Sequence, residues 1–177
     1  MGAFVALRRK AGKMVLHAWL NRQQASPLAV AYRDATRIGL LIPLHGYEDV
    51  LWAEDLHARL AKDGKACTVL CFSASPLAAP ANTDFIVIGA EALRWNFIPK
   101  ENAIKSFISI NFDLLLNLCG DDSCLPLDYA AIRTNAALRV GRYDPALARA
   151  YGLMVRGDFT DGKGLLKAIK HYLGKIQ

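Results

Sequence analysis

The polar residues best placed for chemistry follow two apolar segments of the chain. His45 and Gly46 follow the segment 37–43 after one residue, Leu44, and residues 117–123, which include polar residues and a glycine, overlap and follow the end of the segment 112–118. In an open parallel sheet, ligands bind beyond the carboxyl ends of the strands, where the strand order reverses. If the two segments are central, neighbouring strands, the loops after them border one crevice. The candidate ligand-binding residues are His45, Gly46, Asn117, Gly120, Asp121, Asp122 and Ser123.

These residue types suit a phosphorylated or hydroxylated ligand. His45 could bind a phosphate or act as a base, and Asp121 or Asp122 could bind a cation or a sugar hydroxyl. Both loops lead toward expected helix N-termini, which favour anions. The alternative is that both loops are plain turns with capping residues, because neither carries a phosphate-loop or dinucleotide glycine pattern. The sequence therefore predicts no catalytic residue and specifies no cofactor.

Four cysteines stand at positions 67, 71, 119 and 124. Cys67 and Cys71 fall in an apolar run that is typical of a buried strand. Cys119 and Cys124 lack the two tight pairs of ligands that mark structural zinc sites, so we predict no metal site. Cys119 as a nucleophile would depend on His45 as its base. The four cysteines do not resemble a secreted disulfide framework, which favours a reducing, cytoplasmic location.

The excess of positive charge is confined to the beginning of the chain. The net charge is +6, and residues 1–37 hold seven Lys or Arg and one Asp, so the remainder is balanced. Such asymmetry points to an anionic partner: RNA, an anionic membrane surface or an acidic protein. The candidate partner-binding residues are Arg8, Arg9, Lys10 and Lys13. They lie on an expected helix, 3–21, whose apolar residues could instead pack back on the domain and leave the charges merely solvated.

The remaining elements alternate between strands and helices. Continuous apolar runs predict strands that are covered on both faces, and alternation with helices favours right-handed parallel crossovers. We predict an α/β three-layer sandwich with a mainly parallel sheet of five or six strands, preceded by a basic N-terminal helix. Residues 1–36 form a basic helical extension and linker, and 37–177 a Rossmann-like domain. No apolar run approaches the length needed to span a membrane. The expected strands are 37–43, 66–72, 84–89, 112–118, 138–141 and 153–155. The expected helices are 48–62, 101–110, 126–135 and a last helix, capped by Thr160 or Asp161, whose apolar stripe runs from 165 to 176.

Several stretches resemble a known group of proteins. The sequences FDLLLNL, LPLDYAAIRTNA and ALRVGRYD, with LRWNFIP and HYLGKI, resemble an uncharacterised family of small bacterial proteins, a domain of unknown function. That resemblance implies a Rossmann-like sandwich and no known activity. The same strand–helix–strand stretch is similar to the N-terminal half of heptosyltransferase-type glycosyltransferases, which bind the sugar nucleotide mainly through a second half. Because the chain ends at residue 177, we expect no catalysis by this chain alone.

Two functions follow from these observations. The first is a cytoplasmic binding or interaction module without autonomous catalysis that reaches an anionic partner through its basic helix. The alternative is an enzyme or half-enzyme that binds a nucleotide or sugar phosphate in the crevice at His45 and Gly120. A helix that projects from the domain would favour the first, and a pocket lined by both loops would favour the second. The sequence does not specify an oligomeric state.

Overall fold

A single parallel sheet organises the computed structural model, which describes residues 2–22, 30–77, 80–120 and 124–173. Its six strands run in the order β3-β2-β1-β4-β5-β6, and every neighbouring pair is parallel. The predicted α/β class with a parallel sheet of five or six strands is therefore confirmed. The strands are β1 (Arg37–Leu44), β2 (Ala66–Ser73), β3 (Phe85–Ile88), β4 (Asn111–Asn117), β5 (Asn135–Arg142) and β6 (Leu153–Val155).

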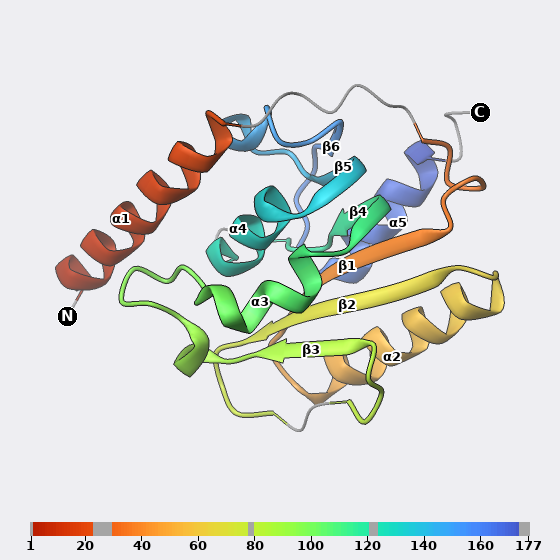
Figure 1. The fold of residues 1–177 in the computed structure, drawn as a ribbon, viewed down its shortest axis with the longest axis horizontal. Helices are drawn as coiled ribbons and strands as arrows, with labels where there is room; N and C mark the ends of the chain where they lie inside the picture. Colours follow the sequence, from red (N-terminus) through yellow and green to blue (C-terminus); the bar gives the residue numbers. More distant parts are fainter. Residues whose placement is uncertain (1, 23–29, 78–79, 121–123, 174–177) are drawn as a thin grey trace.

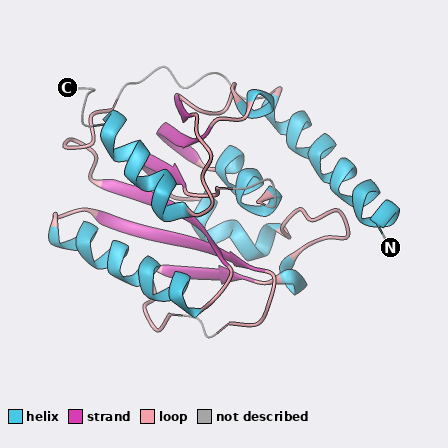
Figure 2. Ribbon diagram, turned by 180° about the vertical axis from the view of Figure 1, so that it is seen from behind, coloured by secondary structure: helices cyan, strands magenta, loops and turns pink. Residues whose placement is uncertain are grey.

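Helices cover both faces of the sheet and make three layers (Figure 1). One face packs against α1, α3 and α4, and the other against α2 and α5, each around its own cluster of buried apolar residues. The same two layers are visible from behind (Figure 2). The helices are α1 (Gly2–Leu20), α2 (Tyr47–Lys62), α3 (Glu101–Ile108), α4 (Leu125–Arg133) and α5 (Gly162–Leu173), with short 3₁₀ turns η1 (Ala90–Ala92) and η2 (Pro145–Leu147).

The central strands are apolar because water reaches neither face of them. In β1, five consecutive residues from Ile38 to Ile42 are buried, as expected for a strand covered on both sides. β5 is longer than the expected 138–141, because α4 ends at Arg133 and Asn135, the last residue of the expected helix, already pairs with Asn111 of β4. The guanidinium of Arg139 is buried and donates to the carbonyl oxygens of Ala131, Thr134 and Ala150, which replace its hydration.

Helix α1 lies against α4 and the loop around residue 96 (Figure 1). Leu16 and Leu20, in its last turns, are buried in the same cluster as the residues of α4. A Cβ atom at Gly12 would lie 2.3 Å from the carbonyl oxygen of Asn96, so only glycine allows this approach. The end of α1 is thus part of the packed structure and does not project from it. Among the described residues, no helix has the length and apolar content of a membrane-spanning segment.

At the amino edge of the sheet, Asp113 of β4 ties β4 to the start of β1. Its carboxylate accepts hydrogen bonds from the backbone N–H groups of Thr36 and Arg37, at 2.9 and 2.8 Å, and from the Thr36 hydroxyl at 2.8 Å. These donors, led by the Arg37 N–H, lower the pKa of Asp113 to about 2. Asp113 therefore acts as a structural link, far along the strand from the carboxyl edge.

Candidate functional site

The strand order reverses between β1 and β4, which are parallel neighbours in register from Ile38↔Leu114 to Leu41↔Asn117. The chain leaves these two strands in opposite directions along the sheet, toward β2 and toward β5. That divergence leaves room between the loops beyond the carboxyl ends, where ligands of open α/β sheets bind. Leu118 continues the ladder, because its N–H donates to the carbonyl of Leu41 at 2.9 Å.

His45 and Gly120 line one small pocket at this position, of about 20 Å³, which we call the β1–β4 pocket. His45 is exposed, and its backbone N–H donates to the Asp49 carboxylate at 2.8 Å. Gly46 is outside the lining, and its backbone is extended. The full lining is Pro43, His45, Asp49, Trp52, Gly120, Thr160, Asp161, Gly162 and Lys163.

The first turn of α5 forms the other wall of the β1–β4 pocket. A Cβ atom at Gly162 would lie 2.7 Å from the carbonyl oxygen of Leu118, so glycine lets this helix begin directly against the end of β4. Asp161 caps the helix by accepting a hydrogen bond from the Gly164 N–H at 2.7 Å. Lys163 adds a cation beside the helix N-terminus. The sequence indicates the cap but not its place in the site, because that place depends on how the chain returns from β6.

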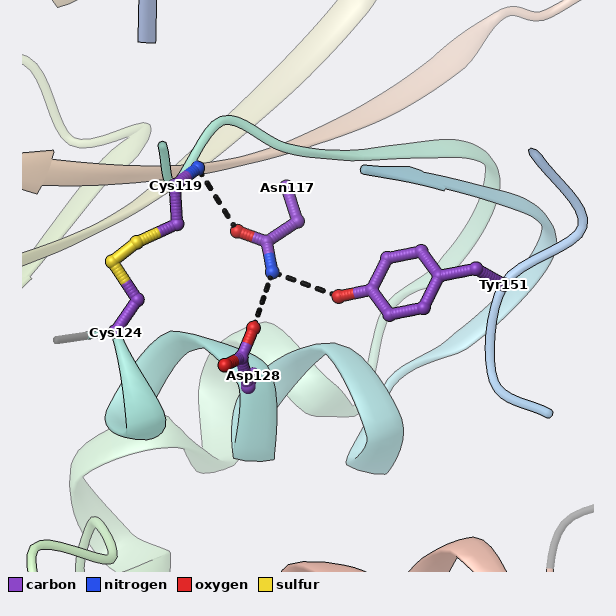
Figure 3. The surroundings of a disulfide bond; sticks show 5 residues. All are labelled: Asn117, Cys119, Cys124, Asp128 and Tyr151. Carbon is purple, nitrogen blue, oxygen red and sulfur yellow. Dashed lines mark hydrogen bonds between the residues drawn. A yellow bond between two sulfur atoms is a disulfide. The ribbon is translucent and has the colours of Figure 1, made fainter. Parts of the chain in front are cut away.

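Asn117 does not turn its amide toward solvent. Its Nδ2 donates to the Asp128 carboxylate and to the Tyr151 hydroxyl, both at 2.8 Å, and its Oδ1 accepts from the Cys119 N–H at 3.3 Å (Figure 3). Burial, reinforced by the charge of Asp128, raises the pKa of Tyr151, which stays a neutral phenol. Asn117 thus fixes the end of β4 against α4. The remaining candidates, Asp121, Asp122 and Ser123, lie outside the described residues.

A disulfide joins Cys119, after β4, to Cys124, before α4 (Figure 3). The sequence does not predict this pairing, since its spacing was interpreted only for a metal site and for Cys119 as a nucleophile. The other two cysteines are buried free thiols inside the sheet, as their apolar surroundings predict. Burial raises the pKa of Cys67 and of Cys71 to about 12.

A second hollow of about 230 Å³ lies at the ends of β1 and β2 and reaches α1, and we call it the α1 cavity. His45 and Pro43 line both this cavity and the β1–β4 pocket. Sequence reasoning missed it because its walls come from five separate parts of the chain. They are Arg9, Pro43, Leu44, His45, Phe72, Ala74, Leu93, Phe97, Cys124, Leu125 and Pro126.

The four basic residues of α1 have different surroundings. The Nε of Arg8 donates to the carbonyl of Trp95, and its guanidinium lies 4.3 Å from the ring centre of Phe97. Arg9 lines the α1 cavity. Lys10 and Lys13 are exposed. Arg8 thus helps to hold α1 in place, whereas Lys10 and Lys13 remain available to solvent.

Within the described part of the chain, no three His, Cys, Asp or Glu side chains are grouped so that they could hold a metal ion.

A family model matches residues 8–176, and the chain belongs to that family, the Family of unknown function (DUF6913). The expected resemblance to a domain of unknown function is confirmed by this match. No curated protein matches the chain.

Proposed function

We propose that this member of the DUF6913 family binds a small phosphorylated ligand, a nucleotide or a sugar phosphate, at the carboxyl edge between β1 and β4. The observation that carries the proposal is that His45 and Gly120, from the loops after the two strands, line one pocket with Lys163. The pocket lies where the strand order reverses.

Two features of the pocket favour a phosphoryl group. Lys163 supplies a cation, and the pocket lies at the N-terminus of α5, where the helix dipole favours an anion. Asp49 and Asp161 also line the pocket, and their negative charges oppose a phosphoryl group, although each carboxylate accepts a backbone hydrogen bond. A pocket of about 20 Å³ has room for about one water-sized group, so it takes one oxygen of the phosphoryl group and the rest of the ligand lies on the open edge of the sheet.

Calorimetric titration with ADP and with glucose 1-phosphate tests this function, with adenosine as the ligand that lacks phosphate. We expect ADP to bind and adenosine to bind at least about fivefold more weakly, the factor that corresponds to one exposed charge contact. Lys163→Gln is expected to weaken the binding of ADP by a similar factor. Lys167→Gln, one turn further along α5 and exposed, is the matched control. Equal binding of ADP and adenosine, or equal effects of the two substitutions, would contradict the proposal.

The outer surface of α1 favours a second function, docking on an anionic membrane surface. Phe4, Leu7 and Met14 are exposed by 63, 58 and 66%, although they are large and apolar. They recur at three- and seven-residue steps and so share one side of the helix, next to the exposed Lys10 and Lys13. Exposed apolar and basic residues on one helix are typical of interfacial binding.

Sedimentation with vesicles tests this second function. We expect binding to vesicles that contain phosphatidylserine, weaker binding to phosphatidylcholine alone, and loss of the difference when Lys10 and Lys13 are both changed to Gln. Lys167 and Lys170 of α5, changed together, provide the matched control. Binding to RNA or to an acidic protein in place of vesicles would assign a different partner to α1. Equal binding to both kinds of vesicle would contradict recognition of an anionic membrane surface.

We also propose a cytoplasmic location, which the buried free thiols Cys67 and Cys71 support. The Cys119–Cys124 disulfide argues in the other direction, because stable disulfides are rare in reducing compartments. Alkylation of thiols in intact cells, followed by mass spectrometry, tests the location. Recovery of Cys119 and Cys124 as alkylated thiols is expected, and their recovery as a disulfide would contradict it.

A further inference from the structure

The α1 cavity has a floor of packed strands and helix and is bordered on one side by Arg9 of α1. Its floor consists of the ends of β1 and β2, represented by Leu44 and Phe72, and of the first turn of α4 at Leu125. Leu44 and Leu125 are buried, so the floor is part of the packed interior. A site built on such elements keeps its shape before a ligand arrives.

Contacts with the 93–99 loop hold α1 beside the cavity. The close approach of Gly12 to the Asn96 carbonyl fixes α1 along the 93–99 loop. Arg8 fixes the same loop through the Trp95 carbonyl and the ring of Phe97. Phe97 keeps a left-handed backbone, with φ of 63°, that non-glycine residues rarely adopt. These contacts hold Phe97 at the cavity wall.

The lining combines an apolar interior with one permanently charged group. Leu44, Phe72, Leu93 and Phe97 supply aliphatic and aromatic surface, and Arg9 supplies a guanidinium. Neither Arg8 nor Arg9 forms an ion pair within the described residues, but the guanidinium of Arg8 contacts the Trp95 carbonyl and the Phe97 ring. Such a lining suits a molecule with an apolar body and one negative charge.

The volume limits the size of that molecule. Apolar cavities of about 150 Å³ already bind benzene, and this cavity has about 230 Å³. One aromatic ring with a short side chain fits, whereas a larger ring system does not.

We propose that the α1 cavity binds a small aromatic carboxylate, with the ring against Phe72 and Phe97 and the carboxylate at Arg9. The site goes beyond the proposed phosphate site, because it requires neither Lys163 nor a phosphoryl group. Because His45 lines both hollows, the two ligands would meet there.

Titration with 3-phenylpropionate and its neutral counterpart 3-phenylpropanamide tests this assignment, with amide resonances followed by NMR. Both ligands are expected to shift resonances around the cavity, and the acid is expected to bind roughly fivefold more tightly. Arg9→Gln should remove the preference for the acid and leave the affinity for 3-phenylpropanamide unchanged. Lys10→Gln, at the next position and exposed, should retain the preference.

A second substitution tests the location of the ring. Ala74 is exposed at the cavity rim, so Ala74→Phe can place a ring over the opening without disturbing buried residues. We expect it to weaken both ligands at least about tenfold at an unchanged melting temperature, because the ligand ring loses its apolar contacts. Lys163→Gln should leave both ligands unaffected, which separates this site from the phosphate site. Equal binding of acid and amide, a preference that survives Arg9→Gln, or no binding at the solubility limit overturns the assignment.

Discussion

The two edges of the sheet use polar and charged side chains in opposite ways. At the amino edge, Asp113 meets donors from Thr36 and Arg37, so that its carboxylate is saturated by the protein. At the carboxyl edge, His45, Lys163 and Arg9 line hollows. In open parallel sheets, ligands bind beyond the carboxyl ends of the strands, at the point where the strand order reverses. A charged residue at the amino edge is therefore a structural link, and one at the carboxyl edge a candidate contact for a ligand.

The largest effect is expected where the carboxyl edge is closed by α1. Gly12→Ala puts a methyl group against the Asn96 carbonyl and should destabilise the protein by about 2 kcal/mol, as overpacking does. Gly2→Ala is the matched control in the same helix, because nothing lies within 4 Å of its added Cβ. Urea unfolding measures both. Equal stability of the two variants would mean that α1 does not pack on this loop.

The next largest effect concerns the link between β4 and α4. Replacing both Cys119 and Cys124 by Ser removes a cross-link over a sequence separation of 5, which is worth about 2 kcal/mol in the chain-entropy account. The free energy of unfolding should fall in the double variant, and reductant should lower that of the parent protein to a similar value. Reductant added to the double variant is the control and should change nothing. An unaffected parent protein would show that the cross-link contributes nothing to stability.

The amino edge should respond to pH by a smaller amount. The folded pKa of Asp113, about 2, lies below the ordinary value of 3.8, so its stabilisation is complete above about pH 4 and disappears as the pH falls toward 2. We discount the contribution for exposure and expect about 1 kcal/mol. Asp113→Asn should lower stability at neutral pH and flatten its dependence between pH 4 and 2. The exposed Asp158→Asn is the control, and the same pH dependence in both variants would contradict the role of Asp113.

The buried thiols of the sheet, between its two edges, should hardly react with a thiol reagent in the folded protein. With pKa values raised to about 12 by burial, the thiols of Cys67 and Cys71 are protonated at pH 8 as well as covered. A disulfide reagent should label neither in the folded protein and both after unfolding in urea. Rapid labelling of the folded protein would mean that β2 opens readily to solvent.

The layered fold was predictable because apolar runs and helical patterns alternate along the chain. Ile38 to Ile42 and Leu114 to Leu116 show no polar alternation, and that alone indicates strands with two covered faces. β5 was predicted too short because the helix before it was extended to residue 135, whereas that helix ends at Arg133 and Asn135 pairs with Asn111. Local patterns report hydrophobicity, and they do not report which distant strand the residues after a helix pair with.

The candidate site was predictable only in part. The strand reversal places His45 and Gly120 at one pocket, and that follows from the general rule for open sheets. Lys163 and Arg9 were not assigned to either hollow, because their positions depend on how α5 and α1 return to the sheet. The role of Asn117 also required the structure, since its partner Tyr151 is 34 residues away.

The docking of α1 on α4 has a consequence for the order in which the protein is made. Leu16 leaves the ribosome well before Leu125, the first residue of α4, which follows it by about 110 positions. At ordinary translation speeds of about 5–20 residues per second, roughly 5–20 s pass before the partner surface exists. During that time the apolar side of α1 has nothing to cover it, so a nascent chain is expected to expose Leu16 and Leu20 to chaperones. The helix that is synthesised first is thus among the last to reach its native contacts.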